Sequence, residues 1–221
     1  MKIKKLISAL VLGSMLVGLS GCNITDFSAE NLLRPPKAVG DEAEIEQLIA
    51  KTADSGYTLK YPKNGKFRSA IIMTDLDGND SNEAVAFFRN SAETSSVHML
   101  VMYSKDNSWE IASDNIFETT DIDSVDFADL TGNGKAEIIV NSTTYTPNVG
   151  KLSCYSYSEG KTNEVGSGQS CSSFVTGDFD NDGTSEIMSL VLYTTENEAL
   201  ASMLDYNEDS KSLYAKAMAN M

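Results

Sequence analysis

Histidine, cysteine and basic residues are scarce in this chain of 221 residues. One histidine and three cysteines are too few for a zinc or haem site. Lys and Arg number 17 against 32 Asp and Glu, giving a formal net charge of −15. Nucleic acid and anionic membrane surfaces would be repelled by this charge, so we expect neither as a partner.

Catalytic motifs are also missing. The chain has no nucleophile elbow, Walker loop, dinucleotide glycine motif or zinc-protease HExxH motif. His98 lies within the strand-like run VHMLVMY, which favours a strand residue over a general base. We therefore expect a protein that is not an enzyme.

What the chain does contain is a nine-residue acidic loop that occurs three times. The copies are DLDGNDSNE at 75–83, DLTGNGKAE at 129–137 and DFDNDGTSE at 178–186. Each begins with Asp, has oxygen-bearing residues at its third and fifth positions, and ends with Glu before an apolar run. The starts of the loops, at 75, 129 and 178, have a spacing typical of propellers, solenoids or arrays.

Oxygen atoms at alternating positions of a tight loop suit Ca²⁺, a hard cation that binds carboxylates, amides, carbonyls and water. These loops are not helix-loop-helix calcium hands, which need a bidentate acid at the twelfth position. That position holds Ala86, Val140 and Ser189 in the three copies. The runs that follow the loops, EAVAFF, EIIV and EIMSLVLY, are typical of strands.

The loops with their flanking strands resemble the FG-GAP repeats of integrin α-subunits and their bacterial VCBS-type relatives. In that family a loop of pattern Asp-x-Asp-x-Asp-Gly-x-x-acid joins the first two strands of a β-propeller blade. The resemblance covers residues 67–221 and implies a mainly β fold of three four-stranded antiparallel blades, at about 67–120, 121–170 and 171–221. It also implies structural Ca²⁺. All three copies end in Glu, where the family more often has Asp.

The resemblance implies three unequal metal sites. The third loop matches the pattern best, the first has Asp80 where Gly is usual, and the second offers only two carboxylates. Since affinity follows ligand charge, the expected order is third, first, second. With the backbone carbonyl of each seventh residue, the candidate ligands are Asp178, Asp180, Asp182, Thr184 and Glu186; Asp75, Asp77, Asn79, Ser81 and Glu83; and Asp129, Thr131, Asn133, Lys135 and Glu137. The alternative is that the loops are plain turns, which Asp, Asn and Gly also favour.

The amino terminus indicates a secreted lipoprotein. A basic start, MKIKK, precedes a short apolar core, and LSGC at 19–22 resembles a bacterial lipobox. This implies removal of residues 1–21, lipidation of Cys22, and an extracytoplasmic protein whose only membrane contact is its lipid anchor. The alternative is an ordinary signal peptide with a Cys after its cleavage site. Without residues 1–21 the chain keeps 14 basic and 32 acidic residues, a formal charge of −18.

Two segments precede the repeats. Residues 22–40 are expected to form a tether, and residues 41–66 a helix followed by a hairpin. Asp41 and Glu44 have the spacing of a capping box, and Asn64-Gly65 between two strand-like runs is a strong hairpin signal.

Besides Cys22, the chain has Cys154 and Cys171. Export by the leader would place both in an oxidising compartment. The sequence leaves two alternatives, a disulfide between them or two buried free thiols.

Three blades are fewer than the roughly four to eight that close a propeller. The chain is therefore expected to be a shortened version of a longer lipoprotein, or an open arc whose edges seek a partner. We predict a calcium-stabilised surface lipoprotein that acts in binding, adhesion or assembly, with a protein or glycan ligand. The alternatives are capture of an extracellular polymer, and a propeller hydrolase or lyase whose active site lies in further blades.

Overall fold

The computed structural model describes residues 40–54, 56–146, 148–193 and 198–220. These residues belong to one compact unit, residues 38–221. The expected leader, the lipidation site at Cys22 and the tether up to residue 39 lie outside the described residues. Within the described ranges, no helix is long and apolar enough to cross a membrane.

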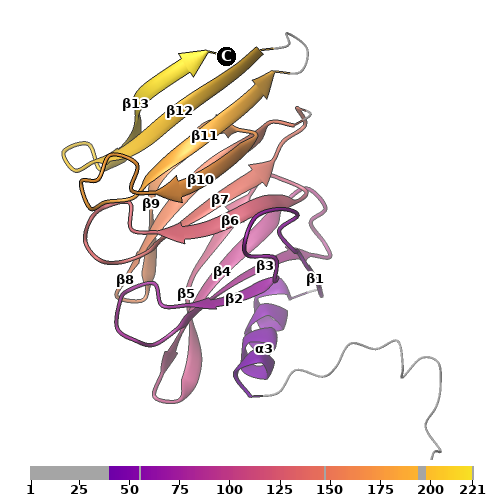
Figure 1. Ribbon diagram of the computed structural model, residues 1–221. Coiled ribbons are helices and arrows are strands. Elements are labelled where there is room, and N and C mark those ends of the chain that lie inside the picture. Colours follow the sequence, from indigo (N-terminus) through magenta and orange to yellow (C-terminus); the bar gives the residue numbers. More distant parts are fainter. Residues whose placement is uncertain (1–39, 55, 147, 194–197, 221) are drawn as a thin grey trace, which may run out of the picture. The chain divides into compact units, whose positions relative to one another are not determined.

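The strands of the described residues form three antiparallel sheets, which confirms the expected mainly β fold (Figure 1). The first sheet holds β1–β5, the second β6–β9 and the third β10–β13. The elements are α3 Asp41–Ala53, β1 Tyr57–Leu59, β2 Ile71–Thr74, β3 Glu83–Asn90, β4 Val97–Lys105, β5 Ser108–Phe117, β6 Ile122–Ala128, β7 Glu137–Thr143, β8 Gly150–Ser158, β9 Lys161–Cys171, β10 Ser173–Gly177, β11 Glu186–Tyr193, β12 Glu198–Asn207 and β13 Ser212–Asn220.

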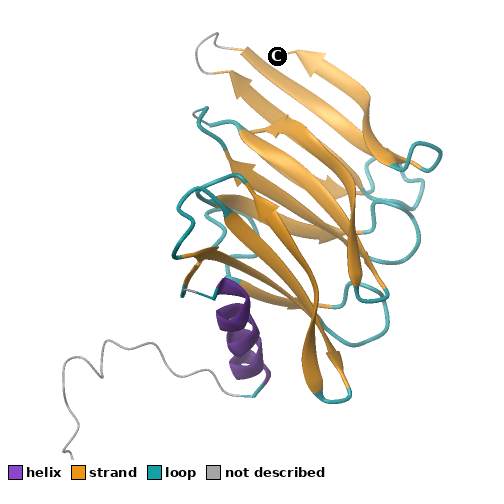
Figure 2. Ribbon diagram, turned by 180° about the vertical axis from the view of Figure 1, so that it is seen from behind, coloured by secondary structure: helices purple, strands orange, loops and turns teal. Residues whose placement is uncertain are grey.

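The helix and the sheets are stacked in sequence order, from α3 through the first and second sheets to the third (Figures 1 and 2). One apolar cluster joins α3 to the first sheet, a second joins the first sheet to the second, and a third joins the second to the third. Each of these cores is therefore shared by two neighbouring layers.

This stacking explains why inner strands are apolar on both faces. In β3, Ala84 packs toward α3 while its neighbour Val85 packs toward the second sheet, and both are fully buried. Among the described residues, the third sheet has such cover on one face only. Ile187 faces the second sheet and is buried, whereas Val175 is 58% exposed and Leu192 is 40% exposed.

Helix α3 covers the outer face of the first sheet. Ile45, Ile49 and Ala53 are buried at a spacing of four residues, which places them along one side of the helix. Burying each isoleucine contributes about 2 kcal/mol. The expected capping box is wrong, because Gly40 is the N-cap and makes no side-chain capping bond. Asp41 is already the first helical residue, so its carboxylate acts at the positive end of the helix dipole instead.

The hairpin expected around Asn64-Gly65 is also wrong. Strands β1 and β2 do not pair with each other; both pair with β3, at its end and its beginning respectively. The long edge of β3 offers more backbone bonds than the two short strands offer each other. The turn between them docks on β6, where the backbone N–H of Asn64 donates to the Asp123 carbonyl at 2.7 Å and Lys63 N–H donates to the Ile122 carbonyl at 3.2 Å.

Candidate functional site

Each acidic loop connects two consecutive strands that pair with each other in one sheet. The first loop (75–83) lies between β2 and β3, the second (129–137) between β6 and β7, and the third (178–186) between β10 and β11. The last residue of each loop is the first residue of the following strand, namely Glu83, Glu137 and Glu186. The strand therefore fixes the position of this glutamate relative to the loop.

The three loops share one set of internal hydrogen bonds. The glutamate that ends each loop accepts a bond of 2.8 Å from the backbone N–H of the second loop residue: Leu76 to Glu83, Leu130 to Glu137 and Phe179 to Glu186. The first Asp of each loop accepts backbone N–H bonds from the middle of the loop. Both ends of the loop are thus tied by carboxylates of its own sequence.

The sixth loop position has a left-handed backbone in every copy. Gly134 and Gly183 adopt φ 79° and 95°, and Asp80 adopts φ 65° in the first loop. Aspartate tolerates this conformation better than most residues because its side chain can bond locally. The departure from Gly at position 80 therefore leaves the loop geometry unchanged.

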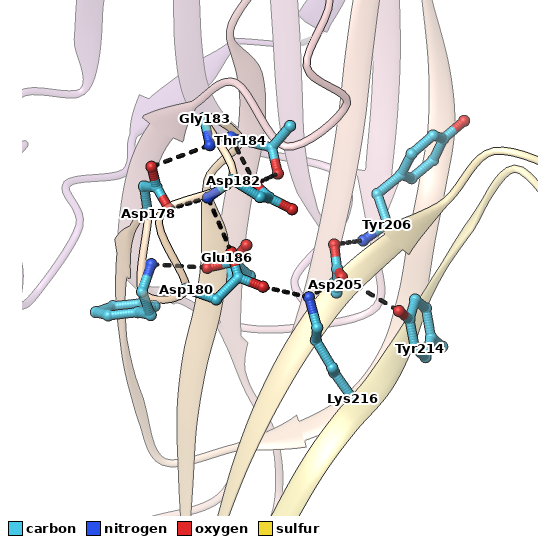
Figure 3. Close-up of polar contacts among 11 residues, drawn as sticks. Asp178, Asp180, Asp182, Gly183, Thr184, Glu186, Asp205, Tyr206, Tyr214 and Lys216 are labelled. Atoms are coloured by element: carbon cyan, nitrogen blue, oxygen red, sulfur yellow. Dashed lines mark hydrogen bonds and ion pairs between the residues drawn. The ribbon is translucent and has the colours of Figure 1, made fainter.

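The third loop brings four carboxylates together. Asp178, Asp180, Asp182 and Glu186 each offer an oxygen within 4.8 Å of the others (Figure 3). Glu186 is fully buried, and its Oε1 has no hydrogen-bond partner in the described part of the chain. A buried carboxylate oxygen without a donor is costly. The missing partner fits a cation, because the surrounding groups are acceptors.

Asp182 is oriented by its neighbour Thr184. Its Oδ1 accepts the Thr184 hydroxyl at 2.6 Å and the Thr184 backbone N–H at 2.9 Å. These bonds hold the pKa of Asp182 below its usual value. The carboxylate is therefore charged and fixed in orientation before any ligand arrives.

The first loop also gathers acids, although fewer. Asp75, Asp77 and Glu83 offer oxygens within 4.8 Å of one another, and Asp77 Oδ1 is buried without a hydrogen-bond partner. Burial raises the pKa of Glu83, and the charges of Asp77 and Asp75 add to this. Burial acts in the same direction on Asp75, but backbone N–H bonds, the largest from Asp80, outweigh it and lower the pKa.

The second loop satisfies its own polar groups. Its buried Glu137 accepts Leu130 N–H on Oε2 and the Thr131 hydroxyl on Oε1 at 3.4 Å. Asn133 turns its side-chain oxygen to the Lys135 N–H at 2.8 Å. Burial, with a smaller contribution from the charge of Asp129, raises the pKa of Glu137 to about 7. Among described residues, no buried side-chain oxygen of this loop lacks a partner.

The loops also contact each other. Ala136 N–H donates to the Leu76 carbonyl at 3.0 Å, and Ser185 N–H donates to the Asp129 carbonyl at 2.8 Å. A Cβ added to Gly132 would lie 2.7 Å from the Thr184 methyl carbon. The three loops thus form a continuous row, with Gly132 needed where the second meets the third.

Three residues beside the third loop were missed by sequence reasoning. Lys216 on β13 contacts the carboxylate of Asp180 and lies 2.9 Å from Asp205 Oδ2 on β12. The Tyr214 hydroxyl donates to the same Asp205 oxygen at 3.2 Å (Figure 3). Nothing in the local sequence of β13 indicates this contact, because Lys216 and Asp180 are 36 residues apart.

The two cysteines are buried free thiols, so the disulfide alternative is wrong. Cys171 lies opposite Gly150 and Cys154 opposite Gly166 on the paired strands β8 and β9. The cysteines are therefore about 13 Å apart along the strand direction. A disulfide needs Cα atoms within about 7 Å.

His98 is held inside a polar cluster. Its Nδ1 lies 2.9 Å from Asp114, its Nε2 lies 3.4 Å from Glu93, and its ring stacks on Phe88 with centroids 4.8 Å apart. The Ser96 hydroxyl donates to Glu93 rather than to the imidazole. The cluster is occupied by its own contacts and presents no activated serine.

Comparisons with known proteins add no assignment to this geometry. No protein-family model matches the chain, and no curated protein shows a significant match.

Proposed function

We propose that this chain is a non-enzymatic surface lipoprotein module, stabilised by calcium in its acidic loops, which acts in binding, adhesion or assembly. The observation that carries the metal assignment is the Oε1 atom of Glu186, which is buried without a partner among three further carboxylates. Clustered acids on a surface are common without an ion. A fully buried acceptor lacking any donor is the feature that separates this loop from a plain turn.

The donor set favours Ca²⁺ over transition metals. It contains only carboxylate and carbonyl oxygens, which hard cations prefer. Mg²⁺ demands a near-octahedral shell and keeps several waters, whereas Ca²⁺ accepts flexible loops and more ligands. Asp178, Asp180, Asp182 and Glu186 would hold the ion with their side chains, and Thr184 would add its carbonyl. Bound there, the ion would neutralise carboxylates that otherwise repel each other.

We further propose that the three sheets are blades of FG-GAP or VCBS type. Consecutive strands form each four-stranded meander, neighbouring sheets share a core, and the acidic loops form one row. These features support the interpretation, as does the position of each loop ahead of the second meander strand. The face of the third sheet that exposes Val175 and Leu192 in the described part of the chain is where a further blade or a binding partner would pack.

Thermal unfolding in calcium and in EDTA tests the metal assignment. At free Ca²⁺ about a hundredfold above its dissociation constant, binding stabilises the folded state by about 2.7 kcal/mol. This raises the Tm by roughly 5–10 °C for a unit of this size. We expect Asp182→Asn to abolish most of this rise, because it keeps the acceptor for Thr184 but removes a ligand charge.

Asp209→Ala is the matched control, since Asp209 is exposed in the turn between β12 and β13 of the same sheet. It should retain the full calcium response. The assignment is wrong if calcium leaves the Tm of the unsubstituted protein unchanged, or if Asp182→Asn lowers the Tm equally in calcium and in EDTA.

A further inference from the structure

Strand β13, at the edge of the third sheet, carries a β-bulge. Strand β13 pairs with β12 so that Ala215 lies opposite Leu204 and Ala217 lies opposite Met203. Lys216 falls between these pairs and has no cross-strand partner of its own. A bulge of this kind redirects the side chain of the extra residue.

The same bulge occurs at the equivalent place in the other two sheets. Between β4 and β5 the register shifts so that Ala112 is the extra residue, and between β8 and β9 it shifts so that Val165 is. In these two sheets the extra residue of the bulge is thus a small apolar one. The fold itself does not require a lysine there, so the charge of Lys216 needs another explanation.

The side chain of Lys216 reaches a candidate metal ligand. Its ammonium contacts Asp180 Oδ2, the third-position carboxylate of the loop, and lies 2.9 Å from Asp205 Oδ2 (Figure 3). Asp205 is the more enclosed of the two acids, with a side chain 12% exposed against 29% for Asp180. Asp205 is therefore suited to hold the lysine when Asp180 binds an ion.

We propose that Lys216 is a built-in counter-cation that competes with the metal ion for Asp180. This inference rests on the proposed binding of a divalent cation by the third loop. In the ion-free loop the ammonium neutralises one of four carboxylates. When the ion binds, Asp180 transfers to it, and Lys216 stays with Asp205.

This competition lowers the affinity of the third loop, which has the most carboxylates, for the metal ion. A single charge about 5 Å from a divalent ion in water, screened at physiological salt, changes the dissociation constant about fivefold. Within the described residues, no ion pair involves Asp75, Asp77 or Glu83 of the first loop. Lys216 thus brings the two metal affinities closer together.

A site-resolved calcium titration tests this. The backbone amides of Gly183 and Gly78 report the third and first loops separately in ¹H–¹⁵N correlation spectra, because both donate to loop carboxylates. For Lys216→Ala we expect the dissociation constant at Gly183 to fall about fivefold, with no change at Gly78. Lys216→Arg, which keeps the charge, should stay within twofold of the unsubstituted protein.

A control variant and a reserve variant complete the experiment. Lys105→Ala removes an exposed lysine of β4 and matches the change in net charge; equal tightening in this variant would refute a local effect of Lys216. Should Lys216→Ala not fold, Lys216→Val repeats the residue that the second sheet uses at its bulge.

The titration distinguishes a failure of the competition by Lys216 from a failure of the metal site. If calcium shifts Gly183 with the same dissociation constant in the Lys216→Ala and unsubstituted proteins, the competition is refuted and the metal site stands. If calcium at about 10 mM, well above the range of extracellular modules, shifts Gly183 in neither protein, the proposed metal site itself is refuted.

Discussion

Replacing Glu137 with glutamine should make the protein clearly more stable in alkaline buffer and change its stability much less in acid. Glu137 is 1% exposed, and its burial raises the pKa to about 7 from an ordinary value of 4.5. Glutamine keeps an oxygen to accept the Leu130 N–H and has a similar shape. The substitution therefore removes a buried charge while retaining most of the loop geometry.

The magnitude follows from this pKa shift. Because each pKa unit corresponds to about 1.4 kcal/mol, ionising Glu137 costs about 3 kcal/mol more in the folded protein than in the unfolded chain. The folded state binds more protons than the unfolded state between these pKa values, so its stability falls as pH rises through this window. The loss is below about 1 kcal/mol at pH 5 and reaches about 3 kcal/mol at pH 8.

Urea unfolding followed by circular dichroism, in EDTA at about pH 5 and pH 8, measures the effect. Glu137→Gln should gain about 2–3 kcal/mol in unfolding free energy at the higher pH and less than about 1 kcal/mol at the lower one. Glu118→Gln, at an exposed acid after β5, serves as the control and should change little at either pH. An equal gain at both pH values, or a loss at pH 8, would refute a buried ionisable Glu137.

Two further predictions concern the cysteines. Burial raises the pKa of Cys154 and raises that of Cys171 to about 12. In a Cys22→Ser background, iodoacetamide at about pH 8 should therefore label both thiols at least a hundredfold more slowly in the native protein than in urea. Fast labelling of the native protein would contradict their burial. The same Cys22→Ser substitution should move the protein from the membrane fraction to the soluble fraction of a bacterial host that lipidates its exported proteins, and continued membrane retention would argue against the lipid anchor.

The chemistry of the loops could be predicted because it is local. Nine consecutive residues contain the candidate ligands, the left-handed position and the closing glutamate, and the structure assembles carboxylate clusters in the third and first loops. The ending in Glu rather than Asp also has a local role, since Glu83, Glu137 and Glu186 each accept the N–H of the second loop residue. Sequence spacing is sufficient for features built this way.

The features that sequence reasoning missed depend on distant partners. Asn64-Gly65 does lie in a turn region, but both flanking strands pair with β3, and the turn makes backbone hydrogen bonds to β6. Lys216, the extra residue of a bulge in β13, contacts Asp180 in a loop that lies 36 residues earlier in the chain. No local sequence pattern predicts which strand edge a strand will pair with, or which lysine will contact a loop carboxylate.

The meander order of the strands has a consequence for how the chain folds. In the second and third sheets every strand pairs with the strand next to it in sequence. Loop-closure entropy is low for such pairings, so contact order is low for an all-β protein and each sheet can form from a short stretch of chain. Since each sheet then contacts only its neighbours, folding can advance one layer at a time, as it does in repeat proteins. The first sheet departs from this order, because β1 must wait for β3 before it has an edge to join.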